Sequence, residues 1–310
     1  VPGVSGGTIA LITGIYDRFI TAIASVGIDA LRMVLAARVK DAWAHIDGNF
    51  LVAVGAGIIS SVVALASLLN WLLLNYPLPL WALFCGLILA SAIHLFYASR
   101  IDWTGREYAL WVTGVGVGAV IGLMQATQLP VGPISVFFAG AIAISAMLLP
   151  GISGSFLLLI MGMYQPVISA LVNVDLASVG LFALGCLCGL LVFSRLLKSL
   201  LARAQKATMA VLYGILFGSV IMLWPWQQPI SSVIDQHGEN RVVQSVPVLP
   251  QTYEGLVGEP MLWLCLLAFS LGAGLVSLLL SVRSVEHSVL VNPHAMRVVV
   301  ATLVLTTWLA

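Results

Sequence analysis

The residues best suited to chemistry in this 310-residue chain form a short motif, Pro-Gly-x-Ser-Gly, which occurs at residues 2–6 and again at 150–154. In each copy the proline interrupts a preceding helix, the glycines permit unusual backbone angles, and the serine can cap a new helix. A helix that starts anew presents unpaired N–H groups and a positive dipole end, which suit an anion such as phosphate. The motif therefore predicts an anion site at two helix N-termini.

The predicted ligands of this anion are the small residues of both motifs and one nearby arginine. They are Gly3, Ser5, Gly6, Gly7, Thr8, Arg18, Gly151, Ser153, Gly154 and Ser155. A second set directly follows the motifs and is predicted to orient the anion or to couple its movement to an ion: Tyr16, Asp17, Tyr164 and Gln165. The plainer interpretation of Asp17 and Arg18 is an ion pair at a helix end.

Two other interpretations of the motif are open. Small residues at this spacing also allow close helix packing in membranes. The Gly-x-Ser-Gly core is also similar to the nucleophile region of rhomboid-type intramembrane proteases, which need a histidine base. His94 is the one histidine inside an expected spanning segment, and its counterpart in the second half is Met222. The sequence therefore favours a binding site without covalent chemistry, and predicts His94 as a packed or interfacial residue.

The composition of the chain predicts which kind of secondary structure carries these motifs. Hydrophobic residues make up 61% of the chain, charged residues only 8%, and the mean hydropathy is +1.09. A typical soluble domain has about 25% charged residues, so a soluble enzyme is excluded. A net charge of +1 gives no basis for nucleic-acid binding. The four cysteines lack metal-ligand spacing, and no cofactor is predicted. The expected fold is an all-α polytopic membrane protein.

Apolar runs of about 20 residues predict the spanning helices. They lie at 50–74, 80–98, 108–127, 176–197, 207–224, 261–282 and, less clearly, 297–310. The motif-bearing stretches 1–26 and 133–171 are predicted as two broken or re-entrant helices. Basic residues gather at 27–49, 99–107, 195–206 and 283–297, which predicts that these loops face the cytoplasm.

An internal repeat relates the two motifs. Residues 1–16 align with 149–164, and eight of the sixteen positions are identical. If the basic loops face the cytoplasm, the helix after the first motif begins on the cytoplasmic side of the membrane, and the helix after the second motif begins on the outer side. The chain is therefore predicted to consist of two inverted repeats, 1–130 and 131–310, an arrangement common in secondary transporters. A further helix is expected before Val1, since an apolar segment precedes the second motif.

The paired motifs, with Gly14-Ile-Tyr16 and Gly162-Met-Tyr164, closely resemble the bacterial polyprenyl-phosphate transporters, or PopT-type undecaprenyl-phosphate translocases, formerly a domain of unknown function. The resemblance implies a multi-pass protein of the bacterial inner membrane. It also implies that undecaprenyl phosphate, the lipid carrier of cell-wall precursors, is returned from the outer to the inner leaflet. Coupling to protons or sodium, and a homodimer, are left open. An ion-coupled carrier of a small soluble anion is the alternative function, and an intramembrane hydrolase is a weaker one.

Overall fold

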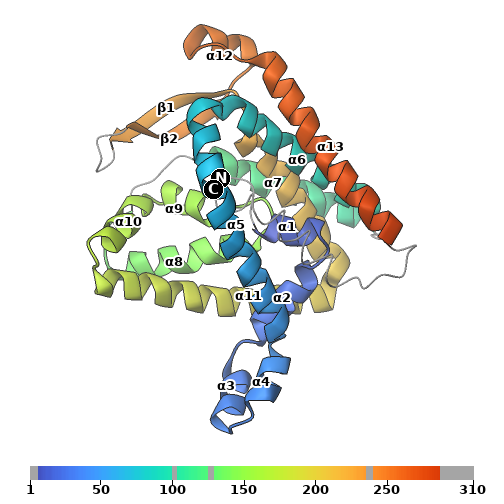
Figure 1. Cartoon of the computed structure of the whole chain (residues 1–310), viewed down its shortest axis with the longest axis vertical. Coiled ribbons are helices and arrows are strands. Elements are labelled where there is room, and N and C mark those ends of the chain that lie inside the picture. Colours follow the sequence, from blue (N-terminus) through green and yellow to red (C-terminus); the bar gives the residue numbers. More distant parts are fainter. Residues whose placement is uncertain (1–5, 100–102, 125–128, 235–239, 287–310) are drawn as a thin grey trace.

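The computed structural model describes residues 6–99, 103–124, 129–234 and 240–286, which are helical except for one β-hairpin (Figure 1). The predicted helix at 297–310 lies outside the described residues. The elements are α1 (Gly6–Ile12), α2 (Tyr16–Ser25), α3 (Ile28–Leu35), α4 (Val39–His45), α5 (Gly48–Asn75), α6 (Pro77–Ala98), α7 (Gly105–Leu123), α8 (Pro133–Leu148), α9 (Gly154–Ile160), α10 (Tyr164–Val172), α11 (Leu176–Ser219), the 3₁₀ helix η1 (Val220–Leu223), β1 (Gln227–Ile234), β2 (Asn240–Pro247), α12 (Pro250–Leu256) and α13 (Leu262–Glu286).

Several helices are long and apolar enough to cross a membrane. Within the described residues, three segments meet this criterion, at Gly48–Leu65, Pro77–Tyr97 and Leu176–Leu223. The bent pair α9–α10 makes a fourth if it counts as one span, and α8 and α13 contain shorter apolar helices. The predicted all-α polytopic membrane fold is therefore confirmed.

Close backbone contacts join the long helices. α6 packs on α13, while α7 and α8 both pack on α11. At each crossing a glycine lies where an added Cβ would overlap the backbone of the neighbouring helix. These glycines include Gly86, Gly114, Gly185 and Gly214. Such contacts suit a membrane interior, where helices associate by packing because lipid tails are as apolar as leucine.

Two predicted connections differ in detail from the structure. Residues 195–206 were expected to form a loop between two helices; α11 consists of two helices that meet at a kink at Ala204, whose φ is −144° and ψ is 54°, so the connection is confined to that kink. Leucine, alanine, lysine and arginine favour helix strongly, so this segment stays helical despite its charge. The predicted loop at 225–260 contains an antiparallel hairpin of β1 and β2, followed by α12.

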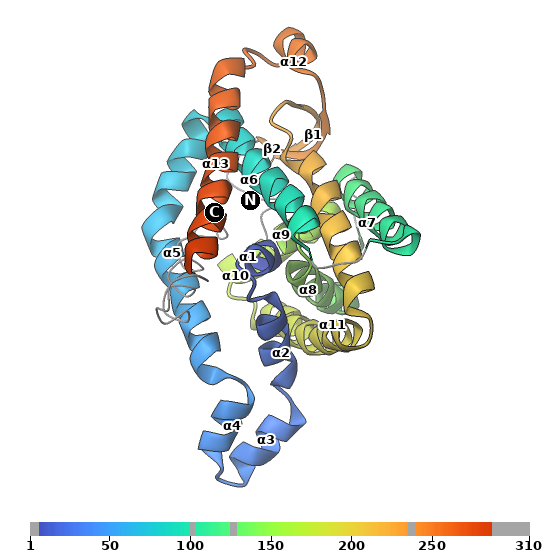
Figure 2. The ribbon, with the colours of Figure 1, turned by 90° about the vertical axis from the view of Figure 1, so that its right-hand side faces the viewer.

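Helices α1 and α2, which follow the first motif, lie at the centre of the fold. Figure 2 shows α1 and α2 between α5, which runs along one side, and α11. Ile9 and Ile20 are fully buried and belong to one hydrophobic cluster with Ile88 of α6 and Leu216 of α11. The short helices α3 and α4 project from the lower end of the molecule in Figure 1. The central position of α1 and α2 brings Thr8 and Tyr16 against the second motif and the end of α8.

Candidate functional site

The two motif copies fold into the same local structure. α1 is described from Gly6 to Ile12, and α9 spans the equivalent positions of the repeat, Gly154–Ile160. Each ends at a glycine with φ of +68°, Gly14 or Gly162. In both copies the amide of that glycine donates to the carbonyl three residues before it, and the next amide donates to the carbonyl five residues before it. This is the Schellman arrangement, which needs a left-handed residue and therefore favours glycine.

A sharp bend follows the second copy. α9 and α10 are related by an angle of 107° across the break at residues 161–163. Together they are apolar enough to count as one membrane segment. The predicted helix break at the second motif itself is confirmed by the end of α8 at Leu148 and the start of α9 at Gly154.

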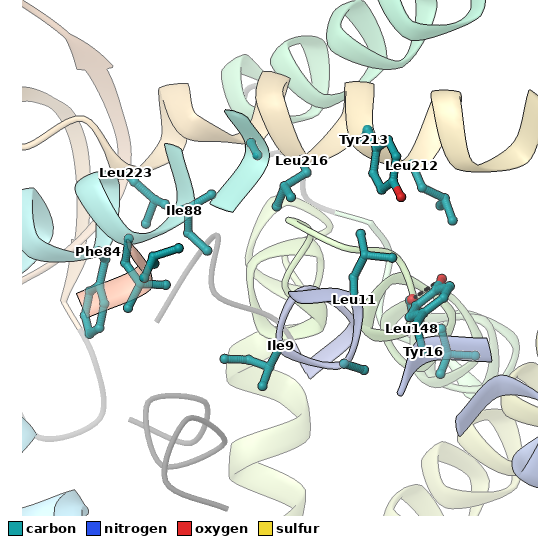
Figure 3. Close-up of a cluster of buried hydrophobic side chains, with 14 of the residues drawn as sticks. Ile9, Leu11, Tyr16, Phe84, Ile88, Leu148, Leu212, Tyr213, Leu216 and Leu223 are labelled. Atoms are coloured by element: carbon teal, nitrogen blue, oxygen red, sulfur yellow. Dashed lines mark hydrogen bonds between the residues drawn. The ribbon is translucent and has the colours of Figure 1, made fainter. Parts of the chain in front are cut away.

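Residues that follow the first motif contact the second motif and the end of α8 directly. The Gly151 amide donates a hydrogen bond of 2.7 Å to the Thr8 hydroxyl, and both residues are buried. The Tyr16 hydroxyl donates to the Leu148 carbonyl over 2.9 Å (Figure 3). A Cβ on Gly7 would lie 2.7 Å from the same carbonyl oxygen. The structure thus brings together Gly7, Thr8 and Tyr16 of the first copy with Gly151 of the second.

The serines of the second motif lie at the start of α9. Ser153 occupies the N-cap position with an extended backbone, and its hydroxyl lies 2.8 Å from the Ser155 hydroxyl. Ser153 is buried, whereas Ser155 is exposed. Neither hydroxyl is used as a side-chain cap of α9. The helix geometry leaves the first N–H groups of α9 without intrahelical acceptors, so two hydroxyls and these amides lie at one helix start.

Arg18 lies away from these helix starts. Its guanidinium binds the Asp47 carboxylate at 2.6 and 3.0 Å and lies 4.4 Å above the centre of the Phe50 ring. Hydrogen bonding from Arg18 holds the pKa of Asp47 below its ordinary value. In this conformation Arg18 therefore connects α2 to the start of α5.

Asp17 faces a different environment from its neighbour Arg18. It lines a cavity of about 230 Å³ together with Tyr16, His94 of α6 and Tyr213 of α11. Its carboxylate also accepts a hydrogen bond of 3.5 Å from Gln205. The cavity walls are polar and apolar in similar measure. Sequence reasoning missed His94, Gln205 and Tyr213 as companions of Asp17, because no spacing relates α6 or α11 to α2.

A second cavity, of about 200 Å³, is almost wholly apolar, and Gly6 and Gly7 of α1 form part of its wall. Its walls come from α1, α2, α5, α8 and α11: Gly6, Gly7, Ile9, Ala10, Ile15, Phe19, Ile23, Val54, Ile58, Ile144, Met147, Leu148 and Leu190. The two cavities share no lining residue. α1 and α2 therefore separate an apolar space from a polar one.

The remaining predicted site residues lie in α10 or outside the described residues. Tyr164 and Gln165 are partly buried at the start of α10, and Tyr164 packs against an apolar cluster of α8 and α9. Gly3 and Ser5 lie outside the described residues. Among the residues that the structure describes, no group of three His, Cys, Asp or Glu side chains could hold a metal ion.

Comparison with known proteins identifies the family. A family model described as VCA0040-like, undecaprenyl phosphate translocase-like, matches residues 1–241. A polyprenyl-phosphate transporter of Vibrio cholerae is 39% identical over 274 residues, which is 88% of each chain. A polyprenyl-phosphate transporter of Staphylococcus aureus is 34% identical over 242 residues, 73% of this chain and 81% of that one. No solved structure matches the chain. The chain belongs to the undecaprenyl phosphate translocase-like family of membrane transporters.

Proposed function

We propose that this protein moves undecaprenyl phosphate from the outer to the inner leaflet of the bacterial inner membrane, so that the carrier is reused for cell-wall precursors. The observation that carries the proposal is the direct contact of Thr8 and Tyr16, which follow the first motif, with Gly151 of the second motif and with Leu148 just before it. It occurs in a family whose curated relatives are named polyprenyl-phosphate transporters. The apolar cavity that begins at Gly6 and Gly7 favours a lipid over a small soluble anion.

The phosphate binds where the two motifs meet. Hydroxyl groups and the amides of helix starts are suitable donors for a phosphate, because charge-assisted hydrogen bonds are stronger than neutral ones. Ser153 and Ser155 supply two hydroxyls, and Thr8 supplies a third from the opposite motif. The remaining proposed ligands are Gly3, Ser5, Gly6, Gly7, Gly151 and Gly154.

Alternating access follows from two inverted repeats, 1–130 and 131–310, that rock about the shared motif contact. Arg18 is bound to Asp47 in the present conformation. Its contact with the phosphate therefore belongs to a second conformation in which that ion pair is broken. The pair is half-exposed, so breaking it costs at most about 1 kcal/mol.

Inward transport of a negative charge needs an energy source. Moving one charge against an inside-negative potential costs about 2.3 kcal/mol per 100 mV, and a phosphate monoester carries about −1.5 to −2 at neutral pH. Proton coupling offsets this cost, with a proton carried on the phosphate or on Asp17. The position of Asp17 in a polar cavity beside His94 and Tyr213 supports that role. Flipping in proteoliposomes should then respond to an imposed pH gradient in wild type, and respond less in Asp17→Asn.

Binding of undecaprenyl phosphate to the purified protein, measured by native mass spectrometry, tests the function. Ser153→Ala and Ser155→Ala should each weaken binding by about 1.5–3 kcal/mol, the contribution of a charge-assisted hydrogen bond. Ser91→Ala is the matched control, because Ser91 is buried in α6 and bonds to the Leu87 carbonyl within its own helix. Wild type that binds inorganic phosphate but no lipid phosphate would instead favour the small-anion carrier.

A further inference from the structure

The apolar cavity next to the first motif has the character of a binding site for hydrocarbon. Its walls expose almost no polar surface. They come from α1 and α2 and from the three helices α5, α8 and α11. On α2 the lining residues Ile15, Phe19 and Ile23 recur every four positions, so they form one face of that helix. Empty space of this kind is costly in a packed protein, and dry apolar cavities readily take apolar guests.

The position of the cavity relates it to the phosphate. Gly6 and Gly7 line its wall and also begin α1, where the phosphate is proposed to bind. Leu148 lines the cavity and accepts the Tyr16 hydroxyl bond that joins the two motifs. A group attached to a phosphate at this motif contact would therefore enter the apolar cavity directly.

The outer wall of the cavity is α5. Val54 and Ile58 of α5 face the cavity, whereas Val52 and Ile59 of the same helix are 57% and 67% exposed. One face of α5 thus contacts the cavity and the opposite face contacts the surroundings. Figure 2 shows α5 along one side of the molecule, so the face of α5 that points away from the cavity lies at the outside of the fold.

We propose that this cavity is the subsite for the phosphate-proximal isoprene units of the lipid, held between α1–α2 and α5. An apolar cavity of about 150 Å³ holds one benzene ring, so the observed volume of about 200 Å³ holds one or two five-carbon units. The rest of the chain passes beside α5 into the bilayer. The inference rests on the proposed function and assigns the recognition of the hydrocarbon to residues separate from those that bind the phosphate.

Substitutions on α5 test the subsite with matched controls. Ile58→Trp fills the cavity, and Ile59→Trp places the same side chain on the exposed face of the same helix. Binding of geranyl phosphate, farnesyl phosphate and undecaprenyl phosphate to the full chain would be measured in detergent. We expect Ile58→Trp to weaken binding of all three by at least about tenfold, and Ile59→Trp to leave it unchanged. The pair Val54→Phe and Val52→Phe repeats the comparison with smaller changes.

The outcomes separate the subsite from the function. If wild type binds lipid phosphates and both tryptophan variants bind equally well, the subsite is overturned and the proposed function stands. If wild type binds none of the three lipids, the proposed function itself fails. If dodecyl phosphate or phosphatidylglycerol displaces geranyl phosphate equally well, the cavity is a general lipid site and the proposal is overturned.

Photolabelling of the wild-type protein gives a measurement that needs no folded variant. Geranyl phosphate with a diazirine on its terminal isoprene unit should label peptides that contain Ile58 or Leu190, which line the cavity from α5 and α11. Undecaprenyl phosphate in excess should suppress this labelling. Labelling confined to peptides outside the cavity walls would overturn the assignment.

Discussion

Replacement of Thr8 by valine should loosen the contact between the two motifs. Valine keeps the shape of the buried side chain but removes the hydroxyl that accepts the Gly151 amide bond of 2.7 Å. A buried donor left without an acceptor costs about 1–3 kcal/mol. Gly151 has little freedom to find another acceptor, because its φ is +85° and its Cα packs against Ser219. We therefore expect Thr8→Val to lower the free energy of unfolding by about 1–3 kcal/mol.

Reversible unfolding in mixed micelles would measure this loss, and Thr13→Val is the control. The Thr13 hydroxyl donates to the Ile9 carbonyl at 2.8 Å, and this carbonyl also accepts the backbone N–H of Thr13. No buried group loses its partner in the control, so its stability should change by less than about 0.5 kcal/mol. Thr8→Ser, which keeps the hydroxyl, should lose less than Thr8→Val. Equal stabilities for Thr8→Val and Thr13→Val would refute the role of the Thr8 hydroxyl.

Three further predictions use the same unfolding measurement. Gly114→Ala should cost about 1–3 kcal/mol because its methyl overlaps the backbone of α11, whereas Gly116→Ala in the same helix meets open space and should not destabilise the protein. Tyr16→Phe removes a buried hydrogen bond and should cost about 1 kcal/mol; an unchanged stability would contradict this contribution. Arg18→Ala should cost less than about 1 kcal/mol at neutral pH. Because the ion pair depresses the pKa of Asp47 in the folded state, the part of that difference due to the pair should be lost as the pH falls through this pKa, while the contact with Phe50 remains; a difference that does not change with pH would exclude the linkage.

The helix break at the second motif could be predicted from sequence because short-range chemistry determines it, whereas the predicted serine cap does not form. Gly14 and Gly162 stop their helices in the same way, since each supplies the left-handed residue that the hydrogen-bond pattern requires. Hydrophobic runs likewise predicted α5, α6 and α13 within a few residues. In these segments one physical constraint, either helix termination or membrane thickness, outweighs the others.

The contacts of the site could not be predicted because they join residues far apart in the chain. The Thr8 hydroxyl meets an amide 143 residues away, and the Gln205 amide reaches Asp17 across 188 residues. Arg18 was expected beside the anion from its charge and its distance to the motif, but the structure pairs it with Asp47. Sequence spacing constrains neighbours on one helix, whereas the partner of a charged side chain depends on how helices pack.

The division of space around the first motif suits a substrate with two unlike ends. The apolar cavity extends from Gly6 and Gly7 along one face of α2, and the polar cavity holds Asp17 and His94 along another. A lipid phosphate needs protein assistance mainly for its charged end, because an ionised group is expensive to move through hydrocarbon and the isoprenoid chain is not. In the proposed arrangement, the polar groups near the motifs hold the phosphate. The hydrocarbon subsite beside them keeps the isoprenoid chain in apolar surroundings. A small anion would have no use for the apolar cavity, so loss of binding in Ile58→Trp alone would separate these two substrates.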